Sequence, residues 1–441
     1  MNFFSRVLKN RWKLFLGFSF ICAIVLRLIW PYDIEYKYDE DYMFRRVMRI
    51  GVSELWPLLG VESSVDVKNP GMSVWVFVIL GKIFSVTNPI ELAQAVQILN
   101  LIGLALLTFF TFTSISKTER EPWFWTIALA SVNPFAVIYQ RKIWAQSILP
   151  FFMVILLIFW WRKNKPLFAF LWGLVAAVVC QIHLSGMFFV AGFLLWNFFA
   201  EKYRDLETVL ATRWRDLISG GFIGSITAIP WLHHLFSFSN DESIFSGLSQ
   251  LLQLRFWVFW ITDPLGLHVG NFLGVQKGNS FFAQLGDFIK LPLISGHPTY
   301  FLGLIHLLLL AIGSFFIITG LIRSFCSIKT KRCGLRDIVL SSSMTGQCQK
   351  AVILGYGLLI TLSTIRIKRF YLLITFPFEF LWIARLALAG SSLKRARILL
   401  GILFVAQLIL SAGFLSYIHV NGGAPQGDYG HVYRLQPKIL K

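Results

Sequence analysis

Long apolar runs recur along the whole chain, and they limit what it can fold into. Of the 441 residues, 56% are hydrophobic and 14% are charged, whereas soluble domains carry about 25% charged residues. Runs of this kind are typical of transmembrane helices, because a helix needs about 20 apolar residues to cross a bilayer. The sequence therefore predicts an all-α polytopic membrane protein, with residues 1–441 forming a single transmembrane domain.

The first apolar run sets the orientation of the chain. Arg6, Lys9, Arg11 and Lys13 precede the run at 14–30, and no small-residue cleavage site follows it. These features predict a retained signal anchor rather than a removed signal peptide. Because basic flanks stay in the cytoplasm, we expect a cytoplasmic N-terminus and an extracytoplasmic segment after the first span.

Alternation from this anchor gives about 11 transmembrane helices. Basic clusters in four of the resulting loops then face the cytoplasm, as the positive-inside rule asks. This arrangement treats 71–86, which is short for a core of about 30 Å, as a juxtamembrane or re-entrant helix; if it spans, every later loop changes sides. The expected spans are 14–30, 91–116, 123–139, 147–161, 167–182, 186–200, 217–235, 298–322, 351–365, 370–390 and 398–417.

Three outer segments follow from this arrangement. They are a first outer loop at 31–89, with a second juxtamembrane helix at 40–56, a long outer loop at 236–297, and an outer C-terminal tail at 418–441. The net charge of +19 comes mostly from short clusters between apolar runs, a pattern that favours anionic lipid as the partner of these charges. No basic domain exists outside the spans, so we expect no nucleic-acid binding.

Three consecutive acids stand in the first outer loop. Asp39, Glu40 and Asp41 follow closely on the first span, where adjacent carboxylates repel one another and are costly to desolvate. A membrane enzyme that needs a carboxylate base at the lipid–water boundary would place one here. The acids equally suit the first turn of a helix, where they favour the helix dipole and pair with Arg45 and Arg46.

Basic residues also occur on the outer side, where topology gives no reason for them. An outward cationic pocket suits a phosphate or pyrophosphate, which arginine binds through two parallel hydrogen bonds. The alternatives are an error in the span parity and nonspecific binding of lipid headgroups. The residues are Arg141, Lys142, Arg366, Lys368 and Arg369, with Lys82 as a weaker candidate.

Four short motifs, taken in order along the chain, resemble the GT-C glycosyltransferases. The resemblance is narrower to the group that uses lipid-phosphate sugars: protein O-mannosyltransferases, aminoarabinose transferases and RgtA/B/C/D-like proteins. It covers residues 1–200 and one late motif. The motifs are Tyr38-Asp39-Glu40-Asp41-Tyr42, Asn69-Pro70-Gly71, Asn133-Pro134-Phe135 with Tyr139-Gln140-Arg141, and Arg369-Phe370-Tyr371-Leu372-Leu373 with Pro377.

This resemblance implies a membrane glycosyltransferase. It would move a sugar from a polyprenyl-phosphate donor to an acceptor hydroxyl of a lipid, glycan or protein, on the extracytoplasmic face of the inner or plasma membrane. The transfer needs a base near the attacking oxygen and cations on the leaving phosphate. We expect Asp39 to be the base, and Glu40 to orient it or to bind the acceptor.

Further substrate contacts are expected in the later outer segments. Gln146 stands where the family often has an aspartate, which puts metal binding at this position in doubt. The long outer loop mixes aromatic and polar side chains that suit a sugar, or equally the aromatic belt of the membrane. The tail is a Gly/Pro-rich loop that either folds over the site or stays a free terminus. The expected substrate-binding residues here are Asp41, Gln146, His268, Tyr371, Asp428 and Tyr429.

No cofactor is expected to be obligatory. The five cysteines show no zinc-ligand spacing, and a divalent metal is left open rather than predicted. Two other classes of function stay open. One is a transporter or flippase of lipid-linked saccharides, although no internal repeat is evident. The other is a noncatalytic assembly factor for an envelope polysaccharide, which the substitution at Gln146 allows.

Overall fold

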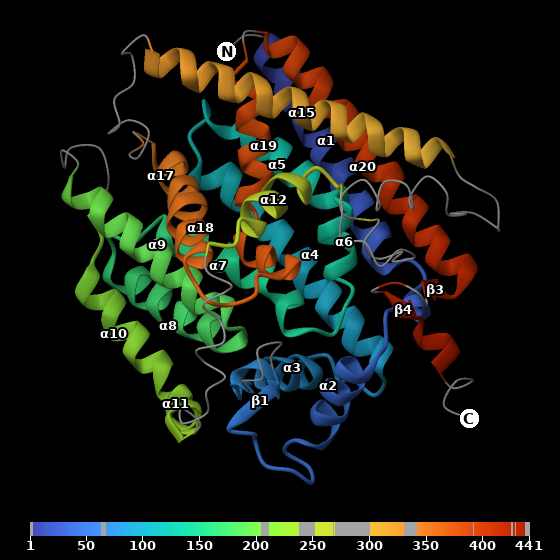
Figure 1. The fold of residues 1–441 in the computed structure, drawn as a ribbon, viewed down its shortest axis with the longest axis vertical. Helices are drawn as coiled ribbons and strands as arrows, with labels where there is room; N and C mark the ends of the chain where they lie inside the picture. The colour runs from blue at the N-terminus through green and yellow to red at the C-terminus, as the bar shows by residue number, and fades with distance from the viewer. Residues whose placement is uncertain are drawn as a thin grey trace.

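The computed structural model describes residues 3–62, 68–203, 211–237, 252–267, 269, 300–329, 341, 343–390, 392–424, 427 and 429–436. These residues form a packed array of helices with two very small sheets (Figure 1). In each sheet two short strands pair antiparallel: β1 (Leu59–Glu62) with β2 (Lys68–Pro70), and β3 (Gly423–Ala424) with β4 (Gly430–His431). The predicted all-α class is confirmed by this content of helix.

Two helices of the first half begin at an asparagine that caps them. Asn88 and Asn133 accept hydrogen bonds from the backbone N–H groups of Glu91 and Ala136, and proline follows each of them, where its missing N–H costs nothing. The helices of this half are α1 (Phe3–Leu28), α2 (Tyr38–Arg49), α3 (Met72–Ile83), α4 (Pro89–Ser114), α5 (Arg120–Val132), α6 (Pro134–Tyr139), α7 (Leu149–Trp160), α8 (Pro166–Ile182) and α9 (Ser185–Lys202).

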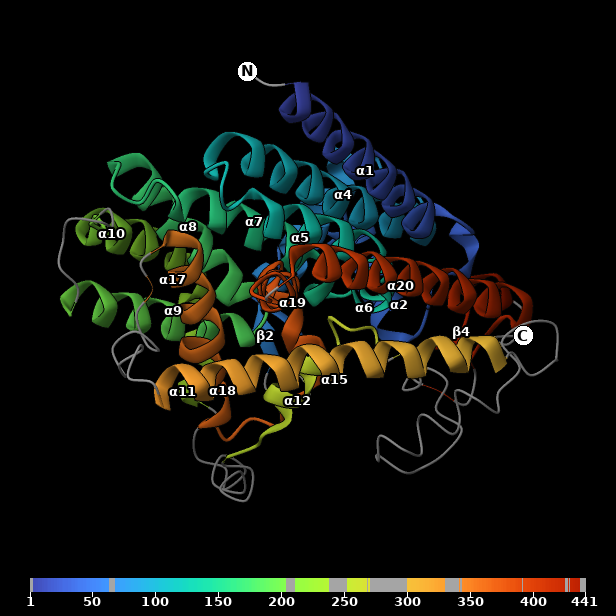
Figure 2. The same ribbon diagram turned by 90° about the horizontal axis from the view of Figure 1, so that it is seen from above.

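Within the described residues, the second half combines two helices of 30 and 29 residues with four of fewer than ten. The helices of this half are α10 (Trp214–Ser225), α11 (Ile229–Ser237), α12 (Arg255–Thr262), α15 (Tyr300–Lys329), α17 (Met344–Lys350), α18 (Gly357–Thr361), α19 (Phe378–Leu388) and α20 (Leu393–Asn421). A π-helical stretch, η5 (Ala351–Tyr356), joins α17 to α18. The 3₁₀ turns are η1 (Pro31–Asp33), η2 (Ala145–Ile148), η3 (Ile226–Ala228), η6 (Arg369–Thr375) and η7 (Tyr433–Leu435). Figure 2 shows α15 lying along α20 at one side of the molecule.

Several of these helices have the length and composition to cross a membrane. Within the described residues, three helices are long and apolar enough: Pro89–Ser114, Leu302–Arg323 and Leu393–Asn421. A fourth candidate is η6 with α19, which are bent by 76° at the break between them. The chain is thus a helical membrane protein. The predicted span at 123–139 is divided at Asn133 into α5 and α6, and the total of 11 spans stays a prediction.

The two helices of the first outer loop are short. Both α2 and α3 have 12 residues, which corresponds to about 18 Å of helix against a bilayer core of about 30 Å. Together with β1 they lie at one end of the molecule (Figure 1). The predicted helix at 40–56 ends earlier, at Arg49, because Gly51 adopts a left-handed conformation with φ 77° and stops it.

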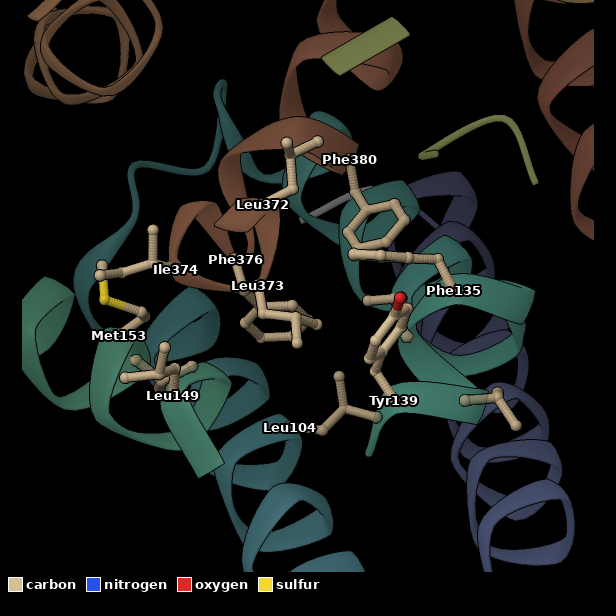
Figure 3. Packing of buried hydrophobic residues seen from close by; sticks show 14 of the residues in the cluster. Leu104, Phe135, Tyr139, Leu149, Met153, Leu372, Leu373, Ile374, Phe376 and Phe380 are labelled. Atoms are coloured by element: carbon tan, nitrogen blue, oxygen red, sulfur yellow. The ribbon is translucent and has the colours of Figure 1, made fainter. Parts of the chain in front are cut away.

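A buried apolar cluster joins α6 to η6 beside this end. Figure 3 shows Leu373 and Phe376 between Leu149 of α7 and the side chains of Phe135 and Tyr139 of α6. All five side chains are buried. The cluster packs η6, which contains the late motif, against α6 and α7, so residues far apart in the sequence meet at one place.

The C-terminal tail returns to the segment that follows α1. The backbone N–H of Tyr433 donates to the carbonyl of Ile34 at 3.0 Å, and the hydroxyl of Tyr429 donates to the carbonyl of Asp33 at 2.6 Å. The carboxylate of Asp33 pairs with His419 at 2.6 Å and with Arg434 at 2.9 Å. The tail therefore holds the stretch of backbone that leads into α2.

Candidate functional site

The acids at the start of α2 differ in their partners. Glu40 accepts a hydrogen bond from the backbone N–H of Lys37 at 2.9 Å, as a helix cap does. Asp41 accepts from the hydroxyl of Tyr36 at 2.9 Å and pairs with Arg45 at 2.7 Å. The helix-capping role considered for these acids thus applies to Glu40 and Asp41.

Asp39 has neither kind of partner among the described residues. Its side chain makes no hydrogen bond and no ion pair within 4.0 Å there. Partial burial raises the pKa of Asp39; the charge of Lys37 opposes this and that of Glu35 adds to it. The carboxylate is therefore available to a ligand, and its basicity is moved toward neutral pH.

Asp39 borders a cavity of about 210 Å³. The walls come from α2, the β1–β2 hairpin, the loop that contains η2, the end of α8 and the start of η6. Of the residues predicted from the sequence, the cavity brings together Asp39 and Gln146. The lining residues are Asp39, Met43, Val61, Asn69, Ile143, Trp144, Ala145, Gln146, His183 and Phe370.

A buried group of charges lies beside Asp39. Lys142 is almost fully buried, pairs with Glu35, and lies 4.2 Å from the centroid of the Trp144 ring. Burial raises the pKa of Glu40 to about 7; Glu35 adds to this and Lys142 opposes it. Lys142 thus compensates acids inside the protein, and Glu40 does not line the cavity.

Arg141 is bound by the end of the first helix. Its guanidinium donates to the carbonyls of Leu26, Arg27, Ile29 and Trp30 at 2.8 to 3.2 Å. These are carbonyls that a helix end leaves without an intrahelical partner, and a cation there also favours the helix dipole. The predicted phosphate ligand is therefore placed as a cap of α1, and it does not line the cavity.

Arg369 is paired with an acid that the sequence analysis did not single out. Its Nη1 donates to Asp263, and its guanidinium carbon lies 4.6 Å from the centroid of the Phe259 ring. Burial raises the pKa of Asp263 to about 6, with Arg369 opposing the change. The neighbouring Tyr371 is buried, and its carbonyl accepts from the Tyr356 hydroxyl at 3.1 Å.

The other cations of the late motif are more accessible. Arg366 is exposed and Lys368 is half-buried, and neither forms an ion pair with a described residue. Both precede Phe370, which lines the cavity. Lys82 is exposed and lies 5.9 Å from the centroid of the Trp56 ring, outside the cavity lining. Arg366 and Lys368 are thus predicted cations without a described acid as partner, and both stand a few positions before a residue of the cavity wall.

Sequence reasoning missed three residues of the cavity wall: Asn69, Trp144 and His183. Asn69 was noticed only as part of a motif. Its amide nitrogen donates to the carbonyl of Val61 at 2.9 Å. His183 directly follows the apolar run of α8, and this polar end of a predicted span was a signal that could have identified it.

The substrate contacts predicted in the tail and in the long outer loop can be located only in part. Tyr429 is buried against the segment after α1, as described above, and does not line the cavity. His268 and Asp428 lie outside the described residues. Within the described part of the chain, no group of three or more His, Cys, Asp or Glu side chains could hold a metal ion.

No protein-family model matches the sequence, and no curated protein shows significant similarity to it. The chain is similar in structure to the oligosaccharyltransferase of Archaeoglobus fulgidus in its apo form, with 13% identity, a TM-score of 0.45, and coverage of 92% of this chain and 56% of that one. It is also similar to ArnT of Cupriavidus metallidurans in the apo state, with 14% identity, a TM-score of 0.44, and coverage of 95% and 78%.

A second structure of the archaeal protein, AglB in complex with an inhibitory peptide and a dolichol-phosphate, gives 12% identity and a TM-score of 0.43. The chain spans 56% of the length of both archaeal structures. Likeness at this level concerns the fold alone, so the function proposed below rests on the residues of the site.

Proposed function

We propose that this protein is a membrane glycosyltransferase that moves a sugar from a polyprenyl-phosphate donor to an acceptor hydroxyl on the extracytoplasmic face. The observation that carries the proposal is Asp39, a carboxylate without a described partner at the edge of a cavity with polar and aromatic walls. An acid that served only to cap α2 would have a partner inside the protein, as Glu40 has in the backbone N–H of Lys37 and Asp41 has in Arg45.

The chemistry follows from these positions. Asp39 takes the proton of the acceptor hydroxyl while the hydroxyl oxygen bonds to C1 of the sugar. The bond from C1 to the phosphate oxygen breaks, and polyprenyl phosphate leaves with the electron pair. A base is most effective when its pKa lies near the operating pH, and burial moves the pKa of Asp39 in that direction.

The leaving phosphate needs positive charge near it. Arg366 and Lys368 supply this charge in the proposed site, because they precede Phe370 at the cavity and pair with no described acid. Arg141, Lys142 and Arg369 are excluded from this role because each has a buried partner inside the protein. Glu40 supports the start of α2 and is not a second base.

The proposal is tested with purified protein and a panel of polyprenyl-phosphate sugars, by following the release of polyprenyl phosphate. Asp39→Asn, which is nearly isosteric, should abolish release while the variant folds normally. Asp41→Asn is the matched control and should lose less than tenfold, because Asp41 binds Tyr36 and Arg45 rather than a ligand. Equal loss in both variants, or equal tolerance, would remove Asp39 as the base.

Two further outcomes separate the competing classes. Release from no donor, with donor lipid still bound, would favour a flippase or a noncatalytic assembly factor. One observation favours the noncatalytic assembly factor: the cavity holds Gln146 where the resembled family often has an aspartate. Restoration of activity by Asp39→Glu, in contrast, would support a carboxylate base.

A further inference from the structure

The hydrogen bonds of His183 fix the form of its ring. The backbone N–H of Ser185 donates to Nδ1 of His183 at 3.2 Å, and the Ser185 hydroxyl lies 2.7 Å from the same nitrogen. A nitrogen that accepts from an N–H group carries no proton of its own, so the hydrogen of the neutral ring is on Nε2. Burial also lowers the pKa of His183 to about 3, which keeps the ring uncharged.

The Nε2–H group is the unused end of this ring. His183 is 4% exposed and lines the cavity, and its Nε2 has no hydrogen-bond acceptor among the described residues. Two other residues of the wall hold buried polar atoms without a described partner: Oδ1 of Asn69 and Nε1 of Trp144. Because buried polar groups are normally satisfied, these two buried atoms, together with the Nε2–H group in the same wall, indicate a polar ligand.

The charge of the wall limits that ligand. Of the ten lining residues, Asp39 is the one that carries a charge at neutral pH. The buried cations nearby are held elsewhere, Lys142 by Glu35 and Arg369 by Asp263. A second anion inside the cavity would lie beside Asp39, and the lining itself holds no Lys or Arg to compensate it. Like charges in one site repel.

The size and the aromatic surface of the cavity limit the ligand further. Its volume of about 210 Å³ lies below the roughly 300–1,000 Å³ of pockets for drug-sized ligands, so it suits a single ring. Trp144 and Phe370, whose ring centroids are 5.8 Å apart, supply apolar surface for the C–H groups of such a ring.

We infer that this cavity is the donor-sugar subsite, that it accepts a single sugar ring without a negative charge and excludes uronic acids, and that His183 binds a sugar hydroxyl through Nε2–H. The inference rests on the proposed function and deepens it by naming the class of sugar. His183 is a specificity-determining residue in this account, whereas the base is Asp39. The phosphate lies outside the cavity, toward Arg366 and Lys368.

The test compares the neutral hexosyl polyprenyl phosphate that the wild type uses best with its uronic acid counterpart. The uronic acid donor should be used at least tenfold less well in kcat/KM. His183→Phe keeps an aromatic ring but removes the N–H group that would bind the sugar hydroxyl. It should raise the KM for the neutral sugar donor about tenfold, with a smaller change in kcat. His183→Gln restores an N–H and should recover part of the loss. His233→Phe, at an exposed position on α11, is the matched control and should behave as the wild type.

Binding of both donors to the wild type is measured in parallel, without acceptor, so that sugar selectivity is read independently of transfer. Transfer without discrimination between the two donors, or an unchanged KM in His183→Phe, would overturn the inference but leave the proposed function standing. Absence of transfer with selective binding of the neutral donor would overturn the proposed function and support the subsite. Absence of both would overturn both.

Discussion

Asp39 and Glu40 are neighbours in the chain, yet their carboxyl groups have opposite surroundings. Side chains at i and i+1 do not face each other on a helix, so one turns toward the cavity and the other into the protein. Glu40 is fully buried between its backbone cap and the Glu35–Lys142 pair. The same local sequence therefore supplies both an available carboxylate and a structural one.

The raised pKa of Glu40 should appear in the pH dependence of stability. Its carboxyl titrates near 4.5 in the unfolded chain and at about 7 in the folded protein, so the folded state binds more protons between these values. Stability then falls as the pH rises through this window, by on the order of 3 kcal/mol for this group. Glu40→Gln should be more stable than the wild type at pH 8 and not at pH 4.5, as measured by thermal unfolding in detergent. A difference that is constant with pH would contradict the assignment.

The pair of Asp263 and Arg369 should behave as a structural unit. Removal of one partner leaves a buried charge without compensation, which typically costs 3–5 kcal/mol. Arg369→Gln should therefore lower the free energy of unfolding by about 3 kcal/mol, and Asp263→Asn in the same chain should recover much of it. Donor affinity in the folded fraction should change little. A variant of normal stability with a raised donor KM would instead return Arg369 to the phosphate site.

At the scale of elements, the end of α1 depends on Arg141, a residue that follows α6. Four carbonyls at this end converge on the guanidinium of Arg141. Arg27 of α1 makes the reverse contact, donating to the side chain of Gln140 at 2.8 Å and to the carbonyl of Ser131 at 2.9 Å. These contacts fix the exit of the first helix against α5 and α6.

Loss of this cap should affect stability rather than substrate binding. Arg141→Lys keeps the charge but not the planar fork, and should lower the free energy of unfolding by about 2 kcal/mol at an unchanged donor KM. Arg366→Gln is the matched comparison, since it removes an exposed cation near the cavity and should raise the donor KM without loss of stability. If Arg141→Lys instead raised the donor KM at normal stability, and Arg366→Gln lowered stability at an unchanged KM, the roles assigned to Arg141 and Arg366 would be reversed.

The elements themselves were largely predictable, because their signals are local. The helix at 398–417 follows from its apolar composition. The break at Asn133-Pro134 was not predicted, since a single span at 123–139 was expected, although an asparagine followed by a proline is a signal for a helix start. The partners of the outer cations were not predictable. Glu35 with Lys142 and Asp263 with Arg369 are long-range pairs, and a sequence shows charges without showing which of them meet. His183 was missed for the same reason, since its place in the cavity depends on how α8 packs.

At the scale of the whole molecule, the two outer segments nearest the chain ends form one unit. Tyr429, Val432 and Tyr433 of the tail contact the stretch from Asp33 to Glu35. The aromatic ring of His419 stacks on Trp30 with centroids 4.4 Å apart. The sequence left open whether the tail folds over the site or stays a free terminus; the described residues of the tail contact the segment that leads into α2.

Weakening the contact between the tail and residues 33–35 should make residues 31–41, which lead to Asp39, more mobile. Tyr429→Phe leaves the buried carbonyl of Asp33 without the hydroxyl donor, at a cost of about 1–3 kcal/mol. Amide hydrogen exchange at residues 31–41 should increase, and the transfer rate should fall. Tyr417→Phe, which removes a hydroxyl with no described partner on α20, is the control. Unchanged exchange at 31–41 in Tyr429→Phe would show that the tail does not support α2.

The meeting of tail and acidic segment also bears on how the protein is made. Residues 31–41 leave the ribosome early, whereas residues 429–436 follow almost 400 positions later. Until those late residues are made, the backbone that leads to Asp39 lacks the contacts that hold it. The segment that carries the proposed base is therefore expected to reach its final arrangement only after the last part of the chain has been synthesised.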